Sequence, residues 1–206
     1  MAMMAITPFI LVVNPSIPAK TANEFIQYAK ERPGKLSFSS ANLMSAPHLA
    51  GEMFQAMAGV KLTHVPYAGA QAAYQDVLGG RVDLFFDNAS TALPQVNGGA
   101  VRALAVSSAK RYAVKPELPT VMETGVAPID VETWFGLFAP AATPAPALAK
   151  LRDAVDKARA LPDVVELFGK TGGAVNALGV SETEAFVRRE AERWGKVVRE
   201  AGIRAE

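Results

Sequence analysis

Polar residues gather at three places where an apolar, strand-like run gives way to a helical pattern. The longest is the segment 39–48, SSANLMSAPH, which follows a short strand-like run and opens a helix. Its hydroxyls and backbone N–H groups would face an anion, helped by the positive end of the helix dipole. The alternative is an ordinary serine-rich turn with a helix N-cap. The candidate ligand-binding residues of this segment are Ser39, Ser40, Ala41, Asn42, Met44, Ser45 and His48.

Two further strand-to-helix junctions carry polar groups. At the first, Tyr67 presents its hydroxyl to a ligand or packs as a half-buried aromatic, and Gly69 starts the next helix or permits close approach of a backbone. At the second, Asp87 and Asn88 directly follow an apolar strand. Asp87 could accept a hydrogen bond from a ligand amine or hydroxyl, and we expect one of the two residues to cap the next helix.

The sequence offers little for catalysis. It contains no G-x-S-x-G, H-E-x-x-H, G-x-G-x-x-G or phosphate-loop pattern. With two histidines and no cysteine, we expect no metal and no cofactor. We expect His48 to be structural or to line a cleft, and a hydrolase that uses Ser40 and His48 is the enzymatic alternative. Several helix N-termini at one edge suit holding a carboxylate more than transforming it.

Composition points to a globular protein without a nucleic-acid partner. Of the 206 residues, 50% are hydrophobic and 20% are charged, and the net charge is +1 with scattered basic residues. The apolar start, residues 1–14, has no basic residue in front and contains Pro8, so it does not read as a secretory signal. It is also too short to span a bilayer, and we predict a buried strand at Phe9–Val13 instead.

Strand-like and helical segments alternate regularly from residue 9 to residue 107. The alternation predicts βαβ units and a mostly parallel sheet, which we assign to one α/β lobe. A Thr21–Glu24 capping box opens the first helix, and Gly59 ends the second. The predicted strands are 9–14, 35–39, 61–65, 81–86 and 101–107, and the predicted helices begin near residues 22, 46, 70 and 89.

The second half of the chain, 108–206, has a different texture. A charged, proline-containing stretch at 110–120 suggests a surface connection, and an aromatic strand is predicted at 131–139. Three helices follow, the last opened by a Ser181–Glu184 capping box. These helices have apolar faces but little sheet to cover, so we expect them to pack on strands from elsewhere. The apolar positions are Leu148, Leu151 and Val155 in one helix, and Val187, Ala191, Trp194, Val198 and Ala201 in the last.

Seven motifs agree in order and spacing with those of one known family. They are LVVNPSIPAKTANEFIQYAKERPGKLSFSSA, SAPHLAGEMFQAMAG, HVPYAGA, LGGRVDLFFDN, VRALAVSSAKR, ELPTVMETG and WFGLFAPAATPAP. The chain resembles Bug-type receptors, the TctC-like extracytoplasmic solute-binding proteins of tripartite tricarboxylate transporters. The resemblance covers essentially the whole chain, from about residue 7 to residue 206.

The resemblance implies an α/β fold of the periplasmic-binding-protein-like (type II) clamshell kind. One mostly parallel lobe, 9–107, would be complete, and a second lobe, represented by 108–206, would be incomplete. The ligand would be a small organic anion, namely a di- or tricarboxylate, an acidic amino acid or an aromatic acid. The receptor would deliver it in the periplasm to the membrane permease of a tripartite transporter. The segment 39–48, the Tyr67 turn and Asp87–Asn88 would line one side of the cleft.

The chain departs from the family pattern in two ways. Family members carry a preceding segment with an export signal and the opening of the other lobe, including a Pro- and Gly-rich anion-gripping loop. Family members also often have glycines at the positions of Asn42 and Met44. Larger side chains at these positions would narrow the pocket or alter how the backbone approaches a carboxylate.

Two alternatives compete with a carboxylate receptor. One is a cytosolic effector-binding regulatory domain with the same clamshell fold. The other is a non-functional fragment whose exposed apolar helix faces, at 148–155 and 187–201, drive self-association.

Overall fold

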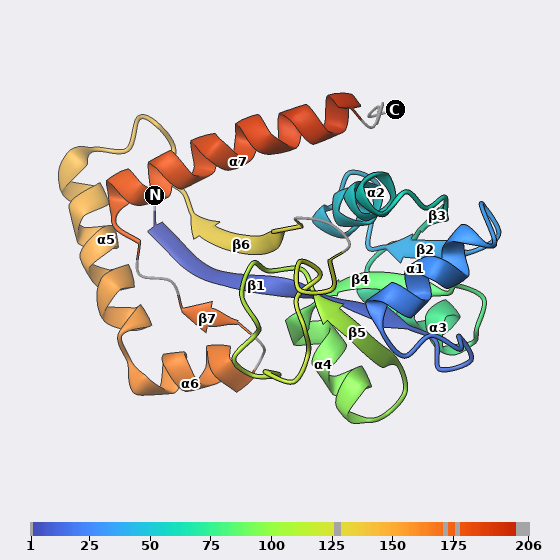
Figure 1. The fold of residues 1–206 in the computed structure, drawn as a ribbon. Coiled ribbons are helices and arrows are strands. Elements are labelled where there is room, and N and C mark those ends of the chain that lie inside the picture. Colours follow the sequence, from blue (N-terminus) through green and yellow to red (C-terminus); the bar gives the residue numbers. More distant parts are fainter. Residues whose placement is uncertain (1, 126–128, 171–172, 176–177, 201–206) are drawn as a thin grey trace.

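The computed structural model describes residues 2–125, 129–170, 173–175 and 178–200. Two groups of helices and strands lie side by side and share one long strand, β1 (Figure 1). The elements are β1 (Ala2–Val13), α1 (Ala22–Lys30), β2 (Ser37–Ser40), α2 (Ala46–Ala58), β3 (Thr63–Pro66), α3 (Ala70–Leu78), β4 (Leu84–Asn88), α4 (Ala89–Asn97), β5 (Arg102–Val106), β6 (Glu132–Leu137), α5 (Ala145–Arg159), α6 (Pro162–Lys170), β7 (Ala174–Val175) and α7 (Val180–Glu200).

The strand β1 belongs to both groups of elements. Its second part, residues 9–13, pairs antiparallel with β4 and β5, and Phe9 lies opposite Asn88. Its first part, residues 2–8, pairs antiparallel with β6 and β7. We call β2–β5, α1–α4 and residues 9–13 the larger half. The smaller half consists of β6, β7, α5–α7 and residues 2–8.

The sheet of the larger half has the order β3-β2-β4-β1-β5. β2 runs parallel to β3 and β4, whereas β1 runs antiparallel to both of its neighbours. The predicted mostly parallel sheet is therefore confirmed for β2–β5, and β1 is the exception. Because β1 reverses direction, the carboxyl ends of β2, β3 and β4 all point toward the smaller half.

Local signals in the sequence fix most helix boundaries. The Thr21 hydroxyl caps α1 by accepting the Glu24 N–H at 3.2 Å, and α2 ends at Gly59 with φ 63°, a left-handed conformation that suits glycine. The predicted start of the last helix was wrong. Ser181 lies inside α7, and the Glu182 carboxylate accepts the Gly179 N–H at 2.8 Å instead.

Side chains alternate between two hydrophobic cores on the opposite faces of the larger sheet. Leu84 and Phe86 of β4 join the first core with α1 and α2, while Phe85 joins the second core with α3 and α4. Successive strand residues point to opposite faces, which explains this division. The helices therefore cover both faces of the sheet (Figure 1).

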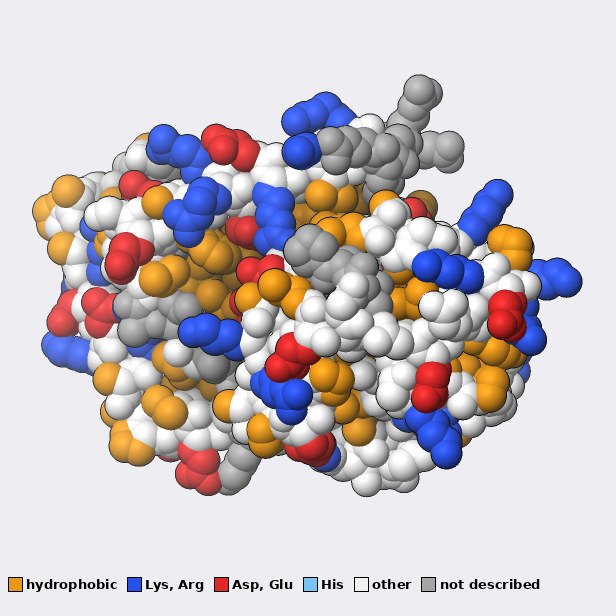
Figure 2. All heavy atoms as spheres, in the orientation of Figure 1, with side chains coloured by type: hydrophobic (Ala, Val, Ile, Leu, Met, Phe, Trp, Pro, Cys, Tyr) orange, Lys and Arg blue, Asp and Glu red, His pale blue; other side chains and the backbone are white. Residues whose placement is uncertain are grey.

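The smaller half has little core of its own. None of the residues of α5 is buried, and large apolar side chains remain exposed on β6, α5 and α6. Hydrophobic side chains are visible in a hollow beneath α7 (Figure 2). The expected incomplete second lobe is thus what the structure shows. The exposed apolar residues are Phe135, Leu137, Phe138, Leu151, Leu161, Val165 and Leu167.

Part of α7 also contacts the larger half. Trp194 packs against the first core, and its indole N–H donates to a Glu190 carboxylate oxygen at 3.0 Å. In the predicted apolar stripe, Val187 and Val198 are half-buried, but Ala191 is exposed and Ala201 lies outside the described residues. α7 therefore spans both halves along the molecule (Figure 1).

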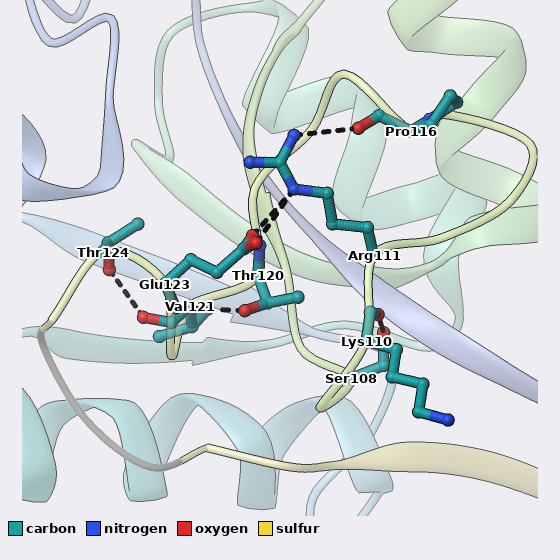
Figure 3. A network of polar contacts seen from close by, with 8 residues as sticks. All are labelled: Ser108, Lys110, Arg111, Pro116, Thr120, Val121, Glu123 and Thr124. Carbon is teal, nitrogen blue, oxygen red and sulfur yellow. Dashed lines mark hydrogen bonds and ion pairs between the residues drawn. The ribbon is translucent and has the colours of Figure 1, made fainter.

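The segment 107–125 that follows β5 folds back and bonds to the end of that strand. Arg111 donates through Nε to both Glu123 carboxylate oxygens at 3.0 and 2.9 Å, and Glu123 also accepts the Thr120 N–H at 2.8 Å (Figure 3). Val121 donates its N–H to the Val106 carbonyl at 2.9 Å. The predicted surface connection thus extends the sheet edge beside β5. No helix in the described ranges has an apolar stretch long enough to cross a membrane.

Residue Ser107 joins β1 to the residue just before β6, at the point where the two halves meet. Its hydroxyl accepts the Phe9 N–H at 2.9 Å and donates to the Val131 carbonyl, while its own N–H donates to the Phe9 carbonyl at 3.0 Å. Ser107 is buried, so these bonds are shielded from water. They join β1 to the start of the segment that leads into β6.

We predict that Gly51→Ala destabilises the larger half. A Cβ atom at Gly51 would overlap the ring of Phe38, a buried residue of β2 that faces α2. Overpacking of this kind costs ~1–3 kcal/mol in unfolding free energy, measurable by urea denaturation. Gly169→Ala in α6 is the matched control, because a Cβ there meets nothing within 4 Å. Equal unfolding free energies for the two variants would contradict this packing.

Candidate functional site

Three helices begin at the edge of the larger sheet that faces the smaller half. The Ser45 hydroxyl caps α2 by accepting the His48 N–H at 3.4 Å. α3 begins at Gly69, with φ 106°, and α4 begins at Asn88, and neither helix has a side-chain cap. The first-turn N–H groups of an uncapped helix seek an acceptor, and together with the helix dipole they attract an anion.

A pocket of about 470 Å³ lies next to the start of α4. Residues from β1, β6 and α6 form one side, and Ser90 from the first turn of α4 reaches it from the larger half. Its walls are mainly apolar, with Thr7 and Ser90 as the hydroxyl groups. The pocket is lined by Met4, Ala5, Thr7, Ser90, Phe135, Phe168 and Gly173.

None of these lining residues was among those predicted from the sequence. Ser90 lies two residues after Asn88, and the pattern of a polar strand end followed by a helix could have indicated it. Phe135 and Phe168 carried no such signal, because they reach the pocket from β6 and α6, far along the chain.

The predicted segment 39–48 divides into a buried base and a loop at the surface. Ser39 and Ser40 are buried, and the Ser39 hydroxyl donates to the Leu84 carbonyl at 3.4 Å. Asn42 is exposed, whereas Ala41, Met44 and Ser45 are half-buried. The surface loop, residues 41–45, is therefore the part of this segment that a ligand can reach.

Behind the loop, two imidazoles are stacked. The rings of His48 and His64 lie 4.0 Å apart between centroids with an angle of 12° between their planes. Burial lowers the pKa of His48, and burial together with the neighbouring His48 lowers the pKa of His64 to about 4. Ser40 is 0% exposed and contacts His64 Nε2 at 2.7 Å, not His48. The Ser40–His48 pair of the enzymatic alternative is therefore not formed.

The Tyr67 turn is held by bonds within the protein. The Tyr67 hydroxyl donates to Asp76 Oδ2 at 2.6 Å, and burial is the main cause that raises the pKa of Tyr67 to about 12. Arg81 also binds the Asp76 carboxylate. The Gly69 N–H donates to the Ala41 carbonyl at 3.0 Å and so joins this turn to the loop 41–45.

Asp87 and Asn88 end β4 beside the pocket. Asp87 is 1% exposed, and its Oδ2 accepts the Thr91 hydroxyl. The Tyr74 hydroxyl lies near this carboxylate, whose Oδ1 has no hydrogen-bond partner in the described part of the chain. Burial raises the pKa of Asp87 to about 6 against the lowering effect of Thr91 and Tyr74. Asn88 is half-buried and occupies the N-cap position of α4, as expected for one residue of the pair, but its side chain makes no capping hydrogen bond.

Together the predicted residues lie along one edge, but their side chains serve different purposes. The side chains that bond to protein groups are those of Ser39, Ser40, Ser45, His48, Tyr67 and Asp87. The side chains nearer the surface are those of Ala41, Asn42, Met44 and Ser45. In the residue ranges that the structure covers, no three His, Cys, Asp or Glu side chains gather in a way that could hold a metal ion.

The fold is that of a two-lobed solute-binding protein. The model of the family described as "Tripartite tricarboxylate transporter family receptor" matches residues 1–203. The chain belongs to this family, whose members are receptors for solutes. The resemblance to Bug-type and TctC-like receptors is thereby confirmed.

Individual relatives agree with this assignment. The "UPF0065 protein in tcbD-tcbE intergenic region" of Pseudomonas sp. (strain P51) is 39% identical over 203 residues, which are 98% of this chain and 60% of the relative. The chain thus spans about three fifths of that relative's length.

Two solved structures show the same fold. "R. palustris Rpa4515 with adipate" is 33% identical with a TM-score of 0.92, over 98% of this chain and 68% of that chain. The periplasmic binding protein BugD is 30% identical with a TM-score of 0.89, over 100% of this chain and 69% of that chain. These likenesses confirm the type II clamshell fold with one lobe incomplete.

We predict that Asp87→Asn raises the free energy of unfolding at neutral pH, where the buried Asp87 carboxyl group of the wild type is charged. A folded-state pKa of about 6 lies above the ordinary 3.8, so the stability supplied by protonated Asp87 is complete below about pH 4 and is lost as the pH rises through 6. The variant should unfold with a free energy on the order of 2–3 kcal/mol above the wild type at pH 7.5 and close to it at pH 4.

Urea denaturation at the two pH values measures this difference. Asp153→Asn is the control, because Asp153 is exposed on α5 and pairs with Lys157, and it should keep the wild-type pH dependence. If Asp87→Asn showed the same pH dependence as the wild type, a charged Asp87 would not be the source of the stability lost at neutral pH.

Proposed function

We propose that this chain is a solute-binding protein that holds a small organic anion in the pocket between its two halves. The observation that carries the proposal is the position of the pocket at the uncapped start of α4, beside the junction of the halves. An anion there would accept hydrogen bonds from the N–H groups of the first helical turn and from the Ser90 hydroxyl. Family membership supports the same function.

We propose that the lobes correspond to residues 9–107 and 108–206, and that the ligand contacts both. On the side of 9–107, the surface loop 41–45, Gly69 and Asn88 approach the ligand. The buried Ser39, Ser40, His48 and Asp87 and the half-buried Tyr67 hold those segments in place through the contacts described above.

The apolar walls favour particular members of the expected ligand class. Among di- and tricarboxylates, acidic amino acids and aromatic acids, those with an apolar body fit walls of Met4, Phe135 and Phe168 best. A tricarboxylate rich in hydroxyl and carboxyl groups would leave several of its polar groups without partners there. The related Rpa4515 structure contains adipate, a dicarboxylate with four methylene groups.

We propose that the protein works in the periplasm, delivers its ligand to the membrane permease of a tripartite transporter and performs no chemistry on it. The related BugD is a periplasmic binding protein. The burial of Ser40 supports the absence of hydrolysis, because a nucleophile must reach its substrate. Family membership favours the receptor over the cytosolic regulatory domain.

We predict that adipate binds the chain and that Ser90→Glu weakens binding. Ser90 is exposed at the start of α4, where a carboxylate side chain would compete with the ligand for the same N–H groups and repel it. Calorimetry should show at least about a tenfold rise in Kd, a change of ~1.4 kcal/mol.

The matched control is Ser16→Glu. It adds the same charge just after β1 at the opposite edge of the larger sheet, where Ser16 is exposed. Its Kd should stay within about twofold of the wild type, since exposed charges that far apart are largely screened. Equal weakening by both variants, or binding of citrate in preference to adipate, would contradict the proposed pocket.

We further propose that two copies of the chain associate through the smaller half. A second, apolar groove lies there between β6 and α5, and its residues Phe138 and Leu151 are each 55% exposed. Exposed apolar patches of this kind favour association. A second copy, which presents the same groove, would cover it by a two-fold contact.

We predict that Leu151→Lys abolishes a concentration-dependent dimer in sedimentation velocity. Leu78→Lys on the larger half, where Leu78 is also exposed, is the control and should leave the dimer intact. A monomer at all concentrations in the wild type would disprove the association, and large irregular aggregates would favour the non-functional fragment instead.

A further inference from the structure

The loop 41–45 contains an unusual backbone conformation. Met44 has φ 58°, and among the described residues it is the non-glycine position with positive φ. A side chain with a Cβ is disfavoured in this left-handed region, so surrounding contacts must hold Met44 there. The strain lies in the segment that we propose approaches the ligand.

Hydrogen bonds from both sides hold the loop. The Asn42 carbonyl accepts the Ser40 hydroxyl at 2.9 Å, the Ser45 hydroxyl at 2.6 Å and the Ser45 N–H at 3.3 Å. The Met44 N–H itself donates to His48 Nδ1 at 3.1 Å. The bond to His48 is therefore the direct side-chain restraint on the strained residue.

This bond requires a particular form of His48. Nδ1 accepts only when it carries no proton, so the neutral ring holds its proton on Nε2. Nε2 lies 3.7 Å from the Glu52 carboxylate on the next turn of α2. A second proton on the ring would occupy Nδ1 and remove the acceptor for Met44.

The stacked partner His64 makes a second proton costly. Because the Ser40 hydroxyl donates to Asn42, His64 Nε2 donates to the Ser40 oxygen at 2.7 Å. Phe38 stacks on the other side of His64, with centroids 4.8 Å apart. Burial disfavours a charge on either imidazole, and a charge on one ring would repel a charge on the other, so protonation would raise the free energy of the folded loop.

We propose that His48 is a positioning residue that holds the loop 41–45 through Met44, and that protonation of the His48–His64 stack releases the loop. The relevance to ligand binding rests on the proposed function, whereas the hold on the loop does not. The release belongs to acid conditions, because burial lowers the pKa of both rings, that of His64 to about 4.

The charged groups around the two stacked rings also disfavour their protonation. Glu52 is the acidic group within 4 Å of the His48 ring, and burial raises the pKa of Glu52, which weakens its ability to hold a protonated ring. From α7, Arg193 and Lys196 share a pocket with Glu52 and oppose further positive charge. β3 contributes His64, and β2 contributes Phe38 and Ser40, which do not titrate in this range.

The test compares His48→Phe with His64→Phe in the ligand-free chain. His48→Phe keeps a flat ring against His64 but removes Nδ1, so Met44 amide hydrogen exchange should become at least about tenfold faster at pH 7. His64→Phe keeps the bond from Met44 to His48, so Met44 exchange should stay within about twofold of the wild type. Similar Met44 exchange in the wild type and in His48→Phe would overturn the proposal.

A titration of the wild type gives a second, independent measurement if a variant does not fold. The chain has two histidines, so both ring signals can be followed by NMR as the pH is lowered. The proposal expects the Met44 amide signal to shift with the same midpoint as a histidine ring, below the ordinary histidine pKa of 6.5. Ring titration without any change at Met44 would overturn it.

Adipate separates this proposal from the proposed function. If adipate binds, its Kd should rise at least about tenfold in His48→Phe and stay close to the wild type in His64→Phe at pH 7. If the chain binds no carboxylate, the proposed function fails, while the exchange and titration results still decide what His48 does.

Discussion

The structure depends on β1, a single strand that is hydrogen-bonded to strands of both halves. Residues 9–13 lie between β4 and β5, and residues 2–8 lie between β6 and β7. The buried Ser107 reinforces the point where the strand passes from one half to the other. The pocket lies along this same strand, because Met4, Ala5 and Thr7 form part of its wall. The position of the proposed ligand therefore follows from the path of β1.

The reversed direction of β1 also determines which ends of the other strands face the pocket. β2, β3 and β4 run against β1, so their carboxyl ends and the helices that follow all point toward the smaller half. Ligands of open α/β sheets bind at such ends. Polar groups are concentrated there because turns and helix starts need them, and the same groups leave helix N–H donors available to an anion.

Much of the fold could be predicted from local sequence signals. The Thr21 and Ser45 caps, the stop at Gly59 and the alternation of strands with helices each depend on neighbouring residues, and the structure confirms them. The direction of β1 and the two-residue strand β7 could not be predicted, because both depend on pairing between distant segments. The start of α7 was misplaced because Ser181 followed by Glu184 imitates a capping box.

The site could be predicted only in outline. The sequence identified the edge of the sheet on which the polar residues lie, but not the direction of each side chain. Because helices cover both faces of the larger sheet, Ser39, Ser40 and Asp87 are buried without any polar–apolar alternation along β2 or β4 that would mark them as interior. Phe135 and Phe168 reach the pocket by tertiary packing alone. The binding roles of the predicted residues stay a prediction.

The most direct measurement of the central claim is an NMR titration of the chain with adipate, followed through the backbone amide signals. A carboxylate held between the halves should shift the amides of residues 88–91, 41–45 and 4–7 together, with one common Kd. The amides of residues 13–17, at the opposite edge of the sheet, should stay in place. Shifts confined to residues outside the pocket and the loop, or no saturable shifts at all, would contradict the account.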